Sequence, residues 1–181
     1  MYGFVLNDPV GNLDLFGLWS PGAHDAMIQH ALKGKASASC IEQLQVSSRK
    51  FDKATQSAAE SYKHAMRREG ESVENAKSKT AAFIRSRLET AKDLAKKGQC
   101  YSAMDALGQA LHPIMDSSSP MHTDSSGNPK EWNPLWPVGH SPNDFIGNET
   151  INDITDAIYK SMDEQIQAAF DNVKGCNCCK P

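Results

Sequence analysis

The chain has 181 residues, of which 39% are hydrophobic and 23% are charged, and its formal net charge is −3 at pH 7. This length is enough for one domain with a substantial core, and this composition excludes a disordered chain. The acidic balance gives no electrostatic footprint for DNA or RNA, and no apolar run approaches the ~20 residues that span a bilayer.

Residues 1–18 differ from the rest of the chain. They are rich in Gly, Asn, Asp and apolar residues, with a turn signal at Asn7-Asp8-Pro9 and a short predicted strand over residues 2–6. They lack the basic region and apolar core of a secretory signal, so we expect any export to use another route. We therefore divide the chain into an extended tail, residues 1–18, and a second domain, residues 19–181.

Apolar positions from Pro21 onward follow helical spacing and predict an all-α domain. Pro21 suits a first helical turn behind Ser20 as N-cap, and Gly34 suits the end of that helix. Further helices are expected over residues 37–47, 51–68, 72–97, 101–115 and about 151–173, with Gly70 and Gly98 ending two of them.

A Ser/Pro/Asn/Gly-rich stretch over residues 117–149 separates the last two predicted helices. Stretches of this length are either disordered or functional. This one contains His122, His140, Trp132 and Trp136, which favours an ordered and functional loop, with the two tryptophans in the core or in a pocket wall.

The five cysteines do not form the pattern of a disulfide-built miniprotein, because their number is odd and three of them crowd the last six residues. The tail Cys176-x-Cys178-Cys179 is compatible with a metal site or a labile disulfide. We favour a third interpretation, a frayed terminus with free thiols.

The histidines carry the most specific chemical pattern. His112 and Asp116 are four residues apart on a predicted helix, so both project from one face, and His122 follows a Ser-Ser-Ser-Pro turn that can fold it back beside them. His140 and Asp144 repeat the same spacing. Because His, Asp and Glu are zinc ligands, this arrangement predicts a zinc site.

Three other groups are expected to lie outside such a site. His30 has no partner at ligand spacing, so it is interpreted as a surface residue. Asp105 and Asp124 are interpreted as surface groups or as groups that support ligands.

Residues 103–122 resemble the central motif of the superfamily of zinc-dependent phospholipases C and single-strand nucleases. The matching residues are Leu107-Gly108-Gln109-Ala110-Leu111-His112, then Asp116, then Pro120-Met121-His122. The resemblance extends over roughly residues 19–145 and implies a helical fold with up to three zinc ions in one cleft. Two residues depart from the motif: Pro113 must disturb the hydrogen bonding of the helix, and Met115 replaces a usual glycine.

The resemblance implies that His112 and Asp116 bind a pair of zinc ions, with Asp116 bridging them and His64 joining His112 on one ion. Family members have an additional acid a dozen or so residues before the equivalent of His64. Asp52 matches it best here, as ligand or general base, and Glu60 is the alternative.

The resemblance implies two further groups of ligands. One consists of His122, His140 and Asp144. The other consists of His24 with the amino group and carbonyl oxygen of an N-terminal tryptophan, which Trp19 matches. The part after residue 145 is much shorter than in the full-length enzymes of this superfamily.

Residues 1–18 resemble the end of an RHS-repeat core, a shell of β-strands that encloses a C-terminal toxin and cuts its own chain with aspartates. The matching segments are Tyr2-Gly3-Phe4-Val5, Asn7-Asp8-Pro9-Val10 and Asp14-Leu15-Phe16-Gly17-Leu18, with Leu15 in place of a common proline. By analogy the cut falls after Leu18. We hypothesise that it both releases the toxin and frees the Trp19 amine, which is a better metal ligand than a peptide nitrogen.

The two resemblances together imply a toxin that hydrolyses phosphodiesters with zinc-activated water, with Asp52 and Asp116 as catalytic residues. The leading expectation is a phospholipase C-like enzyme acting on membrane phospholipids. The first alternative is a nuclease toxin, which the Trp19-x4-His24 spacing and the acid Asp144 favour but the charge does not. The second alternative is a non-catalytic helical module with structural zinc.

The family's biology implies partners and a place of action. We expect the RHS shell before release, a cognate immunity protein in the producing cell and a phospholipid membrane as substrate, with nucleic acid in second place. Without a signal peptide, the protein is expected to be delivered as an effector, such as one of type VI secretion, and to act in the target cell at the membrane.

Overall fold

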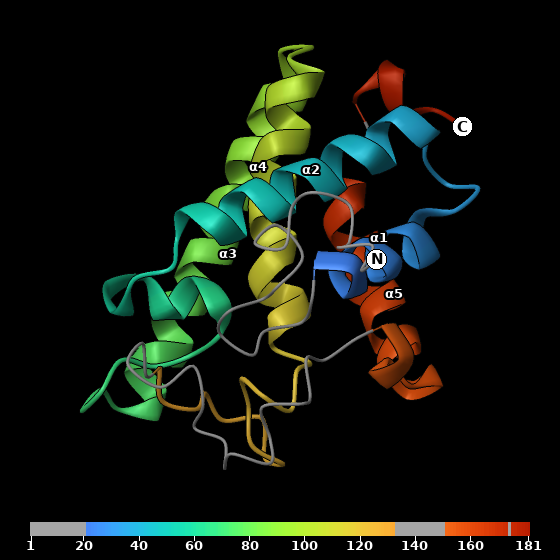
Figure 1. Ribbon diagram of the computed structural model, residues 1–181. Coiled ribbons are helices and arrows are strands. Elements are labelled where there is room, and N and C mark those ends of the chain that lie inside the picture. The colour runs from blue at the N-terminus through green and yellow to red at the C-terminus, as the bar shows by residue number, and fades with distance from the viewer. Residues whose placement is uncertain (1–20, 133–150, 174) are drawn as a thin grey trace, which may run out of the picture.

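The computed structural model describes residues 21–132, 151–173 and 175–181, and these residues form an all-α domain (Figure 1). The α-helices are α1 (Pro21–Leu32), α2 (Ala38–Ala54), α3 (Val73–Lys96), α4 (Cys100–Asp116) and α5 (Asp156–Phe170). Four 3₁₀ helices accompany them: η2 (Ala58–His64), η4 (Ile151–Asp153), η5 (Asp171–Val173) and η6 (Asn177–Cys179). The predicted fold class is therefore confirmed. The strand predicted over residues 2–6 lies outside the described residues.

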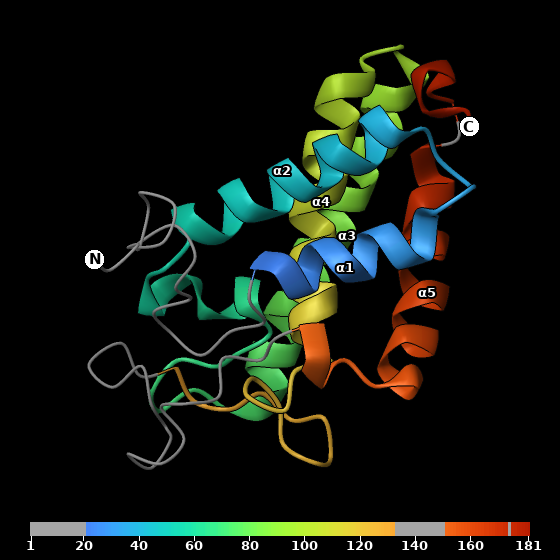
Figure 2. The same cartoon turned by 45° about the vertical axis from the view of Figure 1, so that its right-hand side comes forward.

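Helix α4 is the centre of the domain. Its apolar residues are fully buried at Met104, Leu107 and Leu111, as their helical spacing predicts. It contacts α1, α2, α3, α5 and η2, and Figures 1 and 2 show it running between α2 and α3. Pro113 lies inside α4, which continues to Asp116 although proline has no N–H to donate to the carbonyl of Gln109.

Helices α3 and α4 form a hairpin whose ends the sequence predicts well. The hydroxyl of Ser72 accepts a hydrogen bond from Asn75 N and caps α3. The hairpin turns at Gly98, whose φ of +73° is a conformation that glycine adopts without strain. The predicted helix over residues 72–97 is confirmed.

The segment from residue 37 to residue 68 divides differently from the prediction. A single helix, α2, replaces the predicted short helix and continues into the predicted longer one, and η2 follows as a separate 3₁₀ helix. The predicted short helix ends at Ser47, where two consecutive polar residues, Ser47 and Ser48, interrupt the apolar positions. Both serines are nevertheless buried, because α2 crosses α4 there at close range.

The helix predicted over about residues 151–173 is α-helical only in its middle part, α5. The 3₁₀ helices η4 and η5 occupy the two ends of the predicted range. Helix α5 packs against α1 and α4 and buries Met162 and Ile166. Across the described part of the chain, none of the helices combines the length and apolar character that a membrane span requires.

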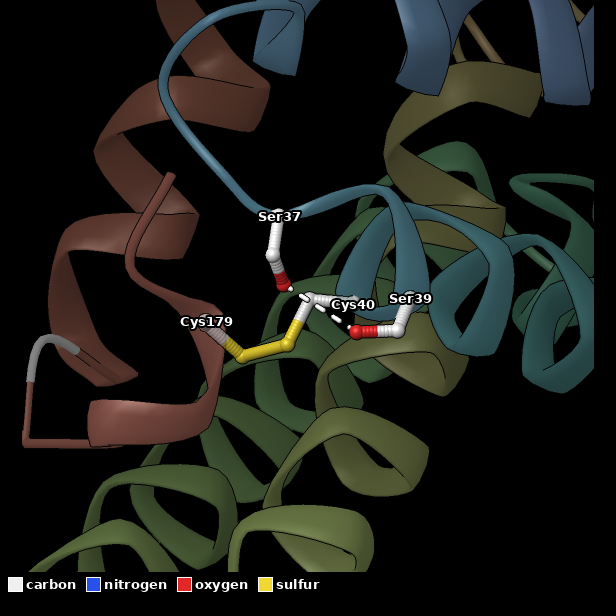
Figure 3. The surroundings of a disulfide bond; sticks show 4 residues. All are labelled: Ser37, Ser39, Cys40 and Cys179. Atoms are coloured by element: carbon white, nitrogen blue, oxygen red, sulfur yellow. Dashed lines mark hydrogen bonds between the residues drawn. A yellow bond between two sulfur atoms is a disulfide. The ribbon is translucent and has the colours of Figure 1, made fainter.

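The prediction of a frayed tail with free thiols is wrong for Cys179. Cys40 at the start of α2 and Cys179 in η6 form a disulfide across 139 residues, and both are buried (Figure 3). The amide of Ser37 also donates to Cys179 O at 3.1 Å. The tail therefore packs against the start of α2, a contact that sequence spacing does not reveal.

Candidate metal centre

One turn of α4 supplies the first two groups of the centre. His112 and Asp116 are one helical turn apart, and the sequence spacing places both on the same face. His112 Nε2 lies 3.1 Å from Asp116 Oδ2, and both residues are fully buried.

Two other elements add a histidine each. His24 lies in the first turns of α1, and its Nε2 is 2.9 Å from Asp116 Oδ1. His64 is the last residue of η2, where Ala65 turns the chain with a φ of +53°. His64 Nδ1 lies 3.3 Å from Asp116 Oδ2 and 3.0 Å from His112 Nε2.

The loop after α4 brings in His122, as the Ser-Ser-Ser-Pro turn predicts. The backbone amide of His122 donates to Ser119 O at 3.1 Å, which folds the loop back over the end of α4. His122 Nδ1 then lies 3.6 Å from Asp116 Oδ2. Farther along, the Asp124 carboxylate accepts from Ser126 N and Asn128 N and stabilises the loop.

The loop is also attached to the segment after η2. Arg67 N donates to Lys130 O at 3.0 Å, and Trp132 N donates to Arg67 O at 2.7 Å. These bonds place the buried ring of Trp132 5.2 Å from the ring of His64, where it forms a wall of the centre, as predicted.

Asp52 from the end of α2 completes the cluster. Its Oδ1 lies 3.7 Å from His112 Nε2 and 3.9 Å from His64 Nδ1, and it accepts a hydrogen bond from Gln56 Nε2 at 2.6 Å. The alternative acid, Glu60, lies elsewhere, since it pairs with Lys63 and Ser57. The geometry therefore favours Asp52 over Glu60.

The electrostatics of the cluster centre on Asp116. Burial opposes its ionisation, but the surrounding histidines, His112 and His122 foremost, hold the pKa of Asp116 well below its ordinary value. Burial also lowers the pKa of His112, and it lowers the pKa of His122 to about 4 against the pull of Asp116. Burial opposes protonation of His64 as well, but its hydrogen bond and charge interaction with Asp116 raise its pKa. At neutral pH, His112 and His122 are therefore uncharged and have the lone pairs that a metal ligand needs.

The polar atoms of the cluster fit a cation. Among the described residues, both ring nitrogens of His122 are buried without a hydrogen-bond partner. Such orphaned groups are costly in a protein interior unless something binds them. The atoms of His24, His112 and Asp116, and those of Asp52, His64 and His112, lie within 4.8 Å of one another in each group. The cluster could therefore hold a metal ion with nitrogen and oxygen ligands.

The structure brings together all the predicted site residues that it describes. These are His24, Asp52, His64, His112, Asp116 and His122. Leu18, Trp19, His140 and Asp144 lie outside the described residues. His30 is on the surface beside Asp163, and Asp105 and Asp124 lie away from the cluster, as predicted.

Sequence reasoning missed the groups that hold the ligands in place. Thr55 contacts His64 Nε2, Ser48 Oγ lies 3.4 Å from His112 Nδ1, and the ring of Phe51 packs edge-on against that of His112. All three are on α2 or at its end. Only their helical spacing marks them, since Phe51 follows Ser48 by three residues and Thr55 follows Phe51 by four, and any helix contains such spacing.

Comparisons with known proteins identify no relative. No family model matches the chain, and neither a curated protein nor a solved structure matches it. The functional argument therefore depends on the motif residues and on the geometry of the cluster.

Proposed function

We propose that this chain is a zinc-dependent phosphodiesterase, released as a toxin from an RHS-repeat protein, that hydrolyses membrane phospholipids in the manner of phospholipase C. One observation carries the proposal. Four histidines from α1, η2, α4 and the following loop surround the buried carboxylate of Asp116, with Asp52 beside them. These are the residues that the phosphodiesterase motif implies as ligands.

The ligand chemistry supports zinc among the metals. Imidazole nitrogens and carboxylate oxygens are ligands that zinc takes, and a catalytic site requires a coordination position left open for water. Zinc, when bound, lowers the pKa of a coordinated water to about 7, so that hydroxide is available at neutral pH. Three ions would also need Trp19, His140 and Asp144.

The residues of the cluster have separable roles in this proposal. Asp116 presents Oδ1 toward His24 and Oδ2 toward His64, His112 and His122, so both of its oxygens would be available to hold cations. Asp52 is less buried than Asp116 and lies 3.7 Å from His112 Nε2, so it is the group placed to accept a proton from the attacking water. The Trp132 and Phe51 rings pack against the rings of His64 and His112 and give the centre an apolar side.

The net charge favours phospholipid over nucleic acid as the substrate. A chain with a net charge of −3 has no excess of basic residues to bind a polyanion, whereas a single headgroup phosphodiester needs only the metal centre. The Trp19-x4-His24 spacing and the acid Asp144 favour a nuclease instead, so this second candidate function is kept.

The proposal includes the events before and after release. Cleavage after Leu18 would free the Trp19 amine close in sequence to His24, the first histidine of the cluster. A producing cell needs protection from such an enzyme, so we propose a cognate immunity protein that blocks the centre. The released domain would act at the membrane of the target cell.

The experiment is a side-by-side hydrolysis assay of residues 19–181 with a free Trp19 amine and bound zinc. The substrates are phosphatidylcholine and phosphatidylethanolamine vesicles, single-stranded DNA and RNA, and the released phosphate ester is measured. The matched blank is the His112→Ala, Asp116→Ala double variant. An uncut chain that binds as much zinc and reacts as fast as the cut one would contradict the role given to Trp19.

The outcomes separate the candidates. Lipid hydrolysis that disappears in the blank supports the phospholipase, and nucleic-acid cleavage that disappears in the blank moves the protein to the nuclease alternative. Zinc binding without hydrolysis of any of these substrates contradicts both and leaves the non-catalytic zinc module.

A further inference from the structure

The hydrogen bonds of Thr55 fix which nitrogen of His64 is protonated. Thr55 ends α2 and is buried against the ring of His64. His64 Nε2 lies 3.1 Å from the backbone carbonyl oxygen of Thr55, and a carbonyl oxygen can only accept. The proton of the neutral imidazole must therefore be on Nε2.

The hydroxyl of Thr55 strengthens this assignment. It donates its own proton to Phe51 O at 2.9 Å, so toward His64 Nε2, 3.0 Å away, its oxygen acts as an acceptor. The N–H of His64 is thus shared between two oxygens of one residue. With Nε2 protonated, the lone pair of neutral His64 is on Nδ1.

His64 Nδ1 faces the centre of the cluster. It lies 3.3 Å from Asp116 Oδ2 and 3.0 Å from His112 Nε2. Asp52 Oδ1, 3.9 Å away, also borders it. Several electron-rich atoms therefore converge on one small volume, which favours a cation there.

We propose that Thr55 is a positioning residue of the metal centre, which holds His64 in the tautomer that binds zinc through Nδ1. The inference rests on the proposed function in that it takes the bound ion to be zinc. Metal-bound histidines generally donate their outer N–H to a fixed acceptor, and the loss of that acceptor typically costs 10- to 100-fold in metal affinity. Thr55 serves this role through two oxygens, its hydroxyl and its carbonyl. The end of α2 therefore supplies both Asp52 and Thr55, and Thr55 orients His64.

The direct test is nuclear magnetic resonance of the 181-residue chain with ¹⁵N-labelled histidine, recorded metal-free and after addition of zinc chloride. Long-range ¹H–¹⁵N correlations distinguish a protonated Nε2 from a protonated Nδ1, and a His64→Gln variant assigns the signals. We expect Nε2–H in both states and zinc on Nδ1. Zinc bound through Nε2, or a metal-free His64 that lacks a proton on Nε2, would overturn the proposal.

Zinc titrations of three variants test the hydroxyl. Thr55→Val removes one of the two acceptors, so zinc affinity should fall by about 10-fold, the low end of such effects. Thr55→Ser keeps the hydroxyl and should restore the affinity. Thr90→Val removes an equivalent bond to the carbonyl four residues earlier, Thr90 Oγ1 to Ser86 O in α3, and should leave the affinity unchanged. Equal affinities for Thr55→Val and the unmodified chain would contradict the positioning role.

These readouts separate this inference from the proposed function. If zinc binds through Nδ1 of His64 and the chain hydrolyses no phosphodiester, the positioning role stands and the enzyme does not. If the chain hydrolyses phosphodiesters with His64 bound through Nε2, the enzyme stands and the positioning role is wrong. A chain that binds no zinc contradicts both.

Discussion

Asp116 is the residue on which the candidate centre depends. Two of its neighbours, His112 and His122, have lowered pKa values and are neutral at pH 7, whereas its interaction with His64 raises the pKa of that histidine. Without a metal, the negative charge of the buried carboxylate favours protonation of His64. A cation in the same volume compensates it better, because it also binds the lone pairs of the neutral rings.

The buried histidines predict a pH dependence for the metal-free protein. The pKa of His122 is about 4 in the folded chain and near 6.5 in the unfolded chain, so below pH 6.5 the unfolded chain binds a proton that the folded chain excludes. The free energy of unfolding should therefore fall as the pH drops from 6.5 to 4, by on the order of 3 kcal/mol from His122 alone. His112 acts in the same direction. His64, with its raised pKa, does not change this trend below pH 6.5, because its stabilising contribution is fully present there and is lost only as the pH rises through its folded pKa.

Urea unfolding of the chelator-treated chain at pH 7 and pH 4.5 measures this effect. A His122→Gln variant should lose much less stability between the two values, because its side chain does not titrate there. His30→Gln, which changes an exposed histidine, is the control and should behave like the unmodified chain. Equal losses in all three chains would contradict the burial of a neutral His122.

The residues of the site were predictable to different degrees. The spacing of His112 and Asp116 on one helix, and the Ser-Ser-Ser-Pro turn before His122, are local and can be read from the chain. His24, Asp52 and His64 came from the resemblance, because no local rule links three separate elements. The hydroxyl of Thr55 was not predictable, since its role depends on a contact with His64 that only the folded chain makes.

At the level of the elements, the crossing of α2 and α4 sets the spacing of the centre. Asp52 lies on α2, and His112 and Asp116 lie on α4. The helices approach closely at Gly108, where an added Cβ would lie 2.6 Å from Ser47 Cβ and 3.0 Å from Leu44 O. Glycine in a helix interior costs about 1 kcal/mol relative to alanine, so the close approach outweighs a loss of helix propensity here.

Gly108→Ala should therefore destabilise the domain and weaken the centre. The clash is expected to cost about 1–3 kcal/mol, reduced by the propensity gain, and to lower the melting temperature by a few degrees. Zinc affinity should fall as well, because α2 and α4 move apart. Melting curves and zinc titrations measure both effects.

Two companion variants make this prediction specific. Ser47→Gly added to Gly108→Ala removes the side chain that clashes and should recover part of the zinc affinity. Gly175→Ala, where the nearest atom would be 3.4 Å away, should leave both properties unchanged. A Gly108→Ala chain that is more stable and binds zinc normally would show that the helices do not need this close approach.

The helices were predictable where local chemistry ends them and less so elsewhere. Gly34 and Gly98 follow helices that end as predicted, and Ser72 caps α3. The boundary near residue 47 was wrong, because small polar residues at a tight helix crossing resemble a break in the apolar pattern. The 3₁₀ helix η2 ends at His64, which is fully buried in the centre, and a local pattern does not predict that packing.

For the molecule as a whole, the Cys40–Cys179 disulfide joins the start of α2 to the C-terminal segment. A link between residues 139 apart constrains the unfolded chain strongly, and removal of such links typically costs about 2–4 kcal/mol. Disulfides persist in oxidising compartments and are rare in a reducing cytoplasm. The sequence could not predict this pair, because five cysteines allow many pairings and spacing does not choose among them.

Loss of the disulfide should lower the melting temperature by about 10 °C, as expected for a domain of this size. Cys40→Ser should show this loss, and a phosphine reductant should lower the melting temperature of the unmodified chain but not that of the variant. Cys100→Ser, which changes a cysteine outside the Cys40–Cys179 pair, is the control. Mass spectrometry of a non-reduced digest should find the peptides of Cys40 and Cys179 linked, and their recovery as separate thiols would contradict the pairing.

The most direct test of the account is the hydrolysis of bis(4-nitrophenyl) phosphate, a phosphodiester that favours neither lipid nor nucleic acid. The rate would be measured for the 19–181 chain, chelator-treated and zinc-loaded, beside a zinc-loaded Asp116→Asn variant of similar shape. We predict hydrolysis only by the unmodified chain with zinc, with a loss of at least ~100-fold in the variant, as expected if Asp116 binds zinc directly and not as an outer partner. Tight zinc binding with no hydrolysis, or equal rates with and without Asp116, would contradict the claim that this cluster is a catalytic metal centre.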